Sequence, residues 1–267
     1  MVKIKDGSIM LKKWSFLCTF YTFFMLTSST ITAQSLGEGS IDEERSNIHS
    51  GNQLRTTFYN NGFVGRVGSK PEDIGGEYPI NSGHEYIGDM LVFVGAEIVD
   101  ENGEVKHSVI TPRGPQVSAR TGDRDPEKGL WYTWEALPDF ANPDTNLVAM
   151  TDLKSAEYNN LDLDPKTGKS FKNGDKFGIT WPDSWPDKLN DAVDPGWAGK
   201  WNGYFGKNVF NADQESFYVM DDYNDGRYQF YPDKNDSLRR GLGLQAICRG
   251  FQWSQVLAQD VLFTLFD

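Results

Sequence analysis

Residues 91–110 read LVFVGAEIVDENGEVKHSVI, and this stretch carries the strongest fold signal in the chain. Two apolar-rich runs, Leu91–Val99 and Val105–Ile110, are joined by the five residues Asp100–Glu104. The pair Asn102-Gly103 supplies the positive φ angles that a tight turn between twisted strands requires. The stretch therefore predicts an antiparallel β-hairpin.

The rest of the chain repeats this pattern of short strand-like segments between Gly, Pro and Asn. With 27 Gly and 12 Pro in 267 residues, turns are frequent, and no long helical period is sustained. The sequence allows one short helix, near residues 184–192. Further strands are expected at Leu54–Tyr59, Trp131–Glu135, Leu147–Thr151, Phe177–Trp181, Phe217–Met220, Tyr228–Tyr231, Leu242–Arg249 and Val261–Phe266.

A second hairpin is expected where Asp221–Gly226 separates Phe217–Met220 from Tyr228–Tyr231. Many short strands with turn signals between them are typical of two packed antiparallel sheets. We predict a mainly β fold, an antiparallel β-sandwich with long loops rich in Trp, Gly and Asp.

The N-terminus has the pattern of an export signal. A basic pair, Lys12-Lys13, precedes the largely apolar run Trp14–Leu26, and the small residue Ala33 follows. We predict a signal peptide over residues 1–33. The apolar run is shorter than the ~20 residues that span a bilayer, so no membrane span is expected in the mature chain.

The remaining residues divide into two parts. Residues 34–52 are polar without periodicity, which predicts a flexible mature N-terminus. Residues 53–267 form the predicted β-rich domain. The apolar strand Val261–Phe266 is followed only by Asp267, so we expect this domain to be truncated at its C-terminal end.

The charge balance argues against nucleic acid as a partner. The formal net charge is −12, and without residues 1–33 the chain keeps 22 basic and 37 acidic residues, a net charge of −15. Such a surface repels phosphate backbones and anionic membranes and attracts divalent cations.

Motifs for catalysis are missing from the sequence. The three histidines have no metal-ligand spacing, and no Gly-x-Ser-x-Gly elbow is present. Cys248, the single cysteine after the leader, lies in an alternating strand pattern and is expected to be a buried apolar side chain. Acidic residues are abundant, but the carboxylate pair of a glycoside hydrolase is defined by its separation in space.

A Trp-rich segment supplies the candidate ligand-binding residues. Trp181-Pro182-Asp183 is echoed by Trp185-Pro186-Asp187, and Trp197 and Trp201 follow. Exposed indole rings can stack on the weakly apolar C–H faces of sugars while the carboxylates of Asp183 and Asp187 accept hydroxyl groups. The alternative is that these rings cap the core of the sandwich, since Trp is highly buried on average.

An acidic turn supplies the candidate metal ligands. Asp221, Asp222, Asn224 and Asp225 offer the oxygen ligands that Ca²⁺ prefers. The turn lacks the EF-hand register, because Pro232 stands where the twelfth-position Glu is required. A solvated turn is the alternative.

Four segments together resemble a bacterial protein family: Trp181–Asp187, Gly196–Gly206, Ala212–Asp222 and Arg239–Gln245. They are similar to the N-terminal region of large, uncharacterised secreted proteins of Bacteroidota-type bacteria. Those proteins often carry further β-sandwich modules and end in a type IX secretion sorting domain. The resemblance covers roughly residues 54–267 and implies export, a β-rich fold and a missing C-terminal part.

These observations lead to one functional expectation and one alternative. We expect an exported, non-catalytic β-sandwich module for surface attachment or contact with a polysaccharide or cell-surface glycan. The alternative is a secreted glycan-active hydrolase with unassigned carboxylates. The expected location is the cell surface or the medium, or the periplasm if the chain ends at residue 267.

Overall fold

The computed structural model describes residues 37–68, 70–113, 124–151 and 180–267. The predicted signal peptide, residues 1–33, lies outside this range, and so do residues 177–179 of one predicted strand. Within the described part of the chain, no helix combines the length and apolar character needed to cross a bilayer.

The described chain is mainly β, as predicted, with antiparallel pairing in both of its larger sheets. The strands are β1 (Ser46–His49), β2 (Thr56–Tyr59), β3 (Phe63–Gly65), β4 (Asp89–Leu91), β5 (Val94–Val99), β6 (Val105–Ile110), β7 (Glu135–Ala136), β8 (Asn202–Gly203), β9 (Gly206–Lys207), β10 (Gln214–Asp221), β11 (Gln245–Gln252) and β12 (Phe263–Phe266). Short 3-10 helices lie at Ile41–Glu43, Pro186–Lys188 and Pro195–Trp197.

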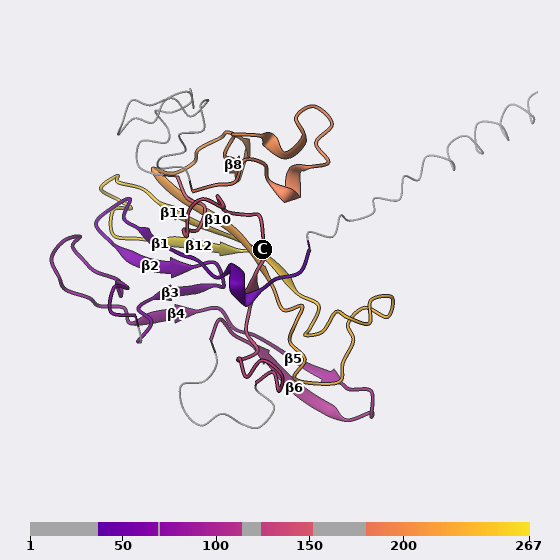
Figure 1. The fold of residues 1–267 in the computed structure, drawn as a ribbon. Coiled ribbons are helices and arrows are strands. Elements are labelled where there is room, and N and C mark those ends of the chain that lie inside the picture. Colours follow the sequence, from indigo (N-terminus) through magenta and orange to yellow (C-terminus); the bar gives the residue numbers. More distant parts are fainter. Residues whose placement is uncertain (1–36, 69, 114–123, 152–179) are drawn as a thin grey trace, which may run out of the picture. The chain divides into compact units, whose positions relative to one another are not determined.

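Two four-stranded sheets dominate, with strand orders β1-β2-β3-β4 and β12-β11-β10-β7 (Figure 1). A core cluster joins them: Phe58 of β2 and Val64 of β3 pack with Tyr218 and Met220 of β10 and with Cys248 of β11. The rings of Phe58 and Tyr218 lie 6.4 Å apart between centroids. Inward side chains of two sheets thus share one core, which is the packing of a sandwich.

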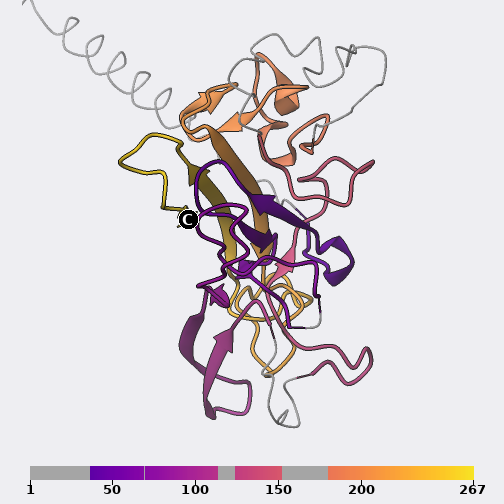
Figure 2. The same cartoon turned by 90° about the vertical axis from the view of Figure 1, so that its left-hand side faces the viewer.

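Strand β10 is buried along its whole length, on both faces. Tyr218 and Met220 contact the core between the sheets, whereas Phe217 and Val219 belong to a second core cluster. Successive side chains point to opposite faces of a strand, so β10 must be covered on both sides. The second cover is the Trp-rich segment after residue 180, which lies at one end of β10 and β11 (Figures 1 and 2).

The hairpin β5–β6 confirms the prediction from residues 91–110. Its register runs from Val94 opposite Ile110 to Val99 opposite Val105. Gly103 has a φ of +78°, and Asp100 Oδ1 accepts the N–H groups of Asn102 and Glu104. In both views the hairpin projects from the two larger sheets (Figures 1 and 2).

The second predicted hairpin is wrong. Strand β10 pairs with β11, from Gln214 opposite Gln252 to Asp221 opposite Gln245, and residues 228–231 form no strand. The buried carboxylate of Asp222 accepts the N–H groups of Leu242 and Leu244. These bonds hold residues 242–244 beside the end of β10. The next strand to pair with β10 is therefore β11, which begins at Gln245, and not the segment directly after the turn.

Three further expectations differ from the structure. Residues 46–49, inside the segment expected to be flexible, form β1, and His49 is 1% exposed. Of the segment Trp131–Glu135, only Glu135 belongs to a strand, the two-residue β7, and Leu147–Thr151 makes isolated bridges at Leu147 and Met150.

Candidate functional site

Three of the four predicted contact tryptophans are core residues. Trp181 is 4% exposed and Trp185 and Trp201 are 0% exposed, packed against Phe217 and Val219 of β10. The indole N–H of Trp185 donates to the carbonyl of Lys200 at 2.7 Å. Their ring faces are therefore closed to a sugar, and the contact role predicted for these three residues is wrong.

The fourth tryptophan, Trp197, and the carboxylate of Asp187 make contacts within the Trp-rich segment itself. Trp197 is half-buried, and its indole N–H donates to Asp191 at 2.7 Å. Asp187 accepts two bonds from the side-chain amide of Asn202, each 3.0 Å long, and pairs with Lys188 at 2.9 Å. Asp183 is exposed, and its backbone carbonyl accepts the N–H of Gly199.

The predicted metal ligands do not converge. Asp221 accepts the N–H groups of Gly39 and Tyr223, at 3.2 Å each, whereas Asp222 binds the backbone of residues 242 and 244. Burial raises the pKa of Asp221 to about 6. Within the described ranges, no group of three or more His, Cys, Asp or Glu side chains is placed to hold a metal ion.

The other two candidate ligands have structural partners as well. The amide of Asn224 donates to Gly39 O at 2.9 Å and to Glu135 at 2.7 Å, and Asp225 pairs with Arg227 at 3.2 Å. Asp221 and Asn224 thus bind the chain at Gly39 to the end of β10, and Asp222 binds the chain at residues 242 and 244 there.

A buried His–Ser contact is likewise structural. His49 Nε2 lies 3.0 Å from Ser216 Oγ, and both residues are 1% exposed. A Cβ atom added to Gly250 would lie 2.5 Å from His49 Nε2. The space around the pair is thus filled by β11, and no substrate can reach the Ser216 hydroxyl.

An exposed line of contacting aromatic rings lies on the outer face of the sheet β12-β11-β10-β7, the face away from the other sheet. We call this line the aromatic row. It consists of Phe205, Tyr204, Phe251, Trp253 and Phe263. In that order, neighbouring ring centroids lie 4.9, 6.4, 6.0 and 5.4 Å apart. Phe205, Tyr204 and Phe263 are 75%, 52% and 49% exposed, and the other two rings are half-buried.

Strand register assembles most of this row. Phe251 of β11 is paired with Phe263 of β12, so their side chains share one face of the sheet. Trp253 continues the alternation just past the end of β11. On the same face the Trp-rich segment covers Phe217 and Val219 of β10, so the row occupies the part of the face over β11 and β12.

The other two rings sit at the tip of the β8–β9 hairpin. Arg249 of β11 anchors this hairpin by donating to the carbonyl of Asn202 at 2.6 Å, and its guanidinium lies 5.9 Å from the Tyr204 ring. Burial lowers the pKa of Arg249 to about 10, and the nearby carboxylates of Glu215 and Asp187 act in the opposite direction. Arg249 therefore stays charged at neutral pH.

Polar contacts also hold the Trp253 end of the row. The indole N–H of Trp253 donates to Asn211 O at 2.8 Å, and the neighbouring Ser254 donates to Asp213. Because its N–H is satisfied, the Trp253 ring is held in one orientation.

Sequence reasoning missed the row, although part of its signal was present. Phe251 and Trp253 alternate at the spacing of a strand, and Phe263 begins the last apolar strand. Without the register between β11 and β12 and the anchoring of the β8–β9 hairpin, nothing in the sequence indicated that these rings meet.

The chain matches no protein-family model, no curated protein and no solved structure.

Proposed function

We propose that the protein is an exported, non-catalytic β-sandwich module that contacts a glycan through the aromatic row. The observation that carries this proposal is a line of five touching rings, three of them about half exposed or more, on one sheet face. Large contiguous exposed apolar patches on soluble proteins mark interaction sites and ligand-binding grooves.

The chemistry of the rings favours sugars. Pyranose rings present C–H groups on their faces, and aromatic rings with a negative π face attract them while hydroxyl groups stay in water. A line of rings at spacings of 4.9 to 6.4 Å can contact successive parts of an extended chain.

The charge around the row favours a neutral glycan. None of its five residues is charged. The neighbouring Lys207 pairs with Asp194 at 2.9 Å, and Arg249 is 8% exposed. With a net charge of −15 beyond residue 33, the chain repels anionic polysaccharides. Export rests on the predicted leader, and the proposed location is the cell surface or the medium.

Retention on insoluble neutral polysaccharides tests the proposal. We expect the intact protein to bind cellulose, chitin or xylan, and Phe205→Ala and Phe263→Ala each to weaken retention by about 3- to 10-fold. Val193→Ala is the matched control, because Val193 is 90% exposed and lies outside the row. Equal retention of all variants, or no retention of the intact protein, would overturn the proposal. Reducing sugar released from the polysaccharide would instead support the hydrolase alternative.

A further inference from the structure

A separate cavity lies between the tip of the β5–β6 hairpin and residues 229–237. Its volume is about 620 Å³, within the range of small-molecule sites. The two walls are joined, because the N–H of Glu101 donates to Gln229 O at 2.9 Å and the Tyr228 hydroxyl donates to His107 O at 3.3 Å. The cavity is thus formed before any ligand arrives.

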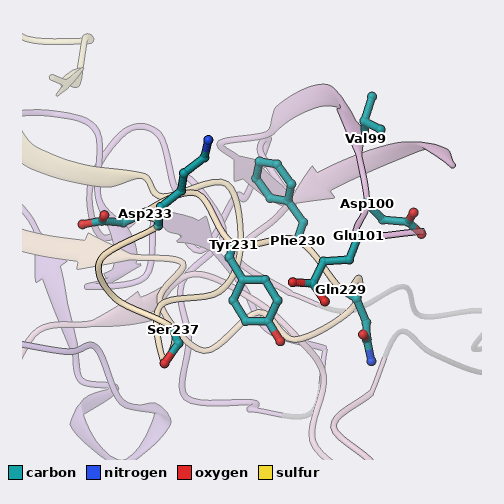
Figure 3. Close-up of a pocket in the computed structure, with 9 residues that line it drawn as sticks. Val99, Asp100, Glu101, Gln229, Phe230, Tyr231, Asp233 and Ser237 are labelled. Atoms are coloured by element: carbon teal, nitrogen blue, oxygen red, sulfur yellow. The ribbon is translucent and has the colours of Figure 1, made fainter. Parts of the chain in front are cut away.

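Several polar groups of the lining have no protein partner among the described contacts. The carboxylate of Glu101 and the ammonium of Lys234 form no ion pair there, and the side chains of Gln229, Tyr231 and Ser237 make no hydrogen bond there. In Figure 3 the Glu101 side chain extends toward Tyr231, whereas the carboxylate of Asp100 points away. The Asp100 carboxylate instead accepts two backbone N–H groups within its own turn.

The apolar residues of the lining are Val99 and two aromatic residues, Phe230 and Tyr231 (Figure 3). The guanidinium of Arg240 lies 4.8 Å from the centroid of the Tyr231 ring, which helps to fix its orientation. The cavity therefore combines ring surface with free donors and acceptors.

This lining selects the class of ligand. An apolar molecule would strip water from Glu101 and Lys234 without replacing their hydrogen bonds, which is costly. An anion would meet the carboxylates of Glu101 and Asp233 against the single ammonium of Lys234. A neutral, hydroxyl-rich ring satisfies the lining, because its hydroxyls can donate to carboxylates and accept from the ammonium while its C–H face contacts an aromatic ring.

We infer that this cavity is a second glycan site, which binds a neutral mono- or disaccharide. The inference rests on the proposed function for the class of ligand, but its residues are separate from the aromatic row. In this arrangement the aromatic row contacts an extended polysaccharide, and the cavity binds one or two sugar units. A module with two such sites gains avidity for a surface that presents both.

Titration of the full chain with soluble sugars tests the inference, with cellobiose, diacetylchitobiose, xylobiose and glucose as probes and NMR shifts as the readout. We expect millimolar binding of at least one sugar. Glu101→Gln is expected to weaken it at least about tenfold, the effect of losing one charge-assisted hydrogen bond. Tyr231→Phe, which keeps the ring, should weaken it less, and Val193→Ala, at an exposed residue that belongs to neither the cavity nor the aromatic row, should leave it unchanged.

The outcomes separate this inference from the proposed function. If none of the sugars binds, or if Phe205→Ala abolishes binding while Glu101→Gln does not, the cavity is not a sugar site, and retention through the aromatic row is unaffected by that result. If Glu101→Gln weakens binding of the soluble sugar while retention on insoluble polysaccharide stays intact, the two sites are independent, as inferred.

Discussion

The indole N–H of Trp201 donates a 2.8 Å hydrogen bond to the fully buried carboxylate of Glu215. The same carboxylate accepts the backbone N–H groups of Asn211 and Ala212. One acidic side chain of β10 thus holds both the Trp-rich segment and the turn that leads into the strand. This contact explains why Trp201 faces the core.

Removal of that carboxylate should destabilise the domain strongly. We expect Glu215→Ala to lower the free energy of unfolding by at least about 3 kcal/mol, because two buried donors and one partly buried donor lose their acceptor and Arg249 loses a nearby opposite charge. Urea denaturation monitored by tryptophan fluorescence measures the change. A loss below about 1 kcal/mol would show that water replaces the carboxylate.

Core and row aromatics should respond differently to truncation. Trp185 is 0% exposed, so Trp185→Ala should cost about 3–5 kcal/mol of stability. Phe205 is 75% exposed, and Phe205→Ala should cost less than about 1 kcal/mol. Thermal and urea unfolding of the two variants checks both values. Similar losses for both would contradict the assignment of Trp185 to the core.

Buried His49 should make stability depend on pH. Burial lowers the pKa of His49 from 6.5 to about 3, so below pH 6.5 the unfolded chain binds a proton that the folded chain does not. Stability is therefore lost as pH falls through this range, by at most about 1.4 kcal/mol per pH unit. Asp221, with a raised pKa of about 6, acts in the opposite direction between about pH 6 and 4.

Comparison with His49→Gln separates the two groups, since Asp221 is common to both proteins. We expect the stability advantage of the unsubstituted chain over His49→Gln to shrink by about 2–3 kcal/mol between pH 7 and pH 4.5. Urea unfolding at each pH provides the measurement. A difference that stays constant with pH would mean that His49 becomes protonated in the folded state.

The acidic turn should stabilise the domain without calcium. Asp222 accepts two backbone N–H groups, at 2.6 and 2.8 Å, so Asp222→Ala should cost about 2–3 kcal/mol. The melting temperature of the unsubstituted chain should be the same with millimolar Ca²⁺ and with chelator. A rise with Ca²⁺ that Asp222→Ala removes would restore the calcium-site hypothesis.

The sequence by itself determined the local elements of this protein. Asn102-Gly103 between two apolar runs was enough to predict the β5–β6 hairpin, because the turn geometry depends on neighbouring residues alone. The density of Gly, Pro and Asn between short apolar runs was enough to predict a mainly β fold. The predicted leader and the resemblance to secreted Bacteroidota-type proteins stay predictions.

Only the tertiary structure decided which segments pair and which rings are exposed. Asp221–Gly226 looks like a hairpin turn, yet β10 pairs with β11 across a longer connection, because the buried Asp222 binds residues 242 and 244. The sequence pattern predicted a contact role for Trp201 and none for Trp253. Their surroundings separate them: Trp201 is buried by its bond to Glu215 and by β10, whereas Trp253 stays half-buried on a face that no described segment fully covers. Burial depends on contacts between distant residues, and a single sequence does not specify those contacts.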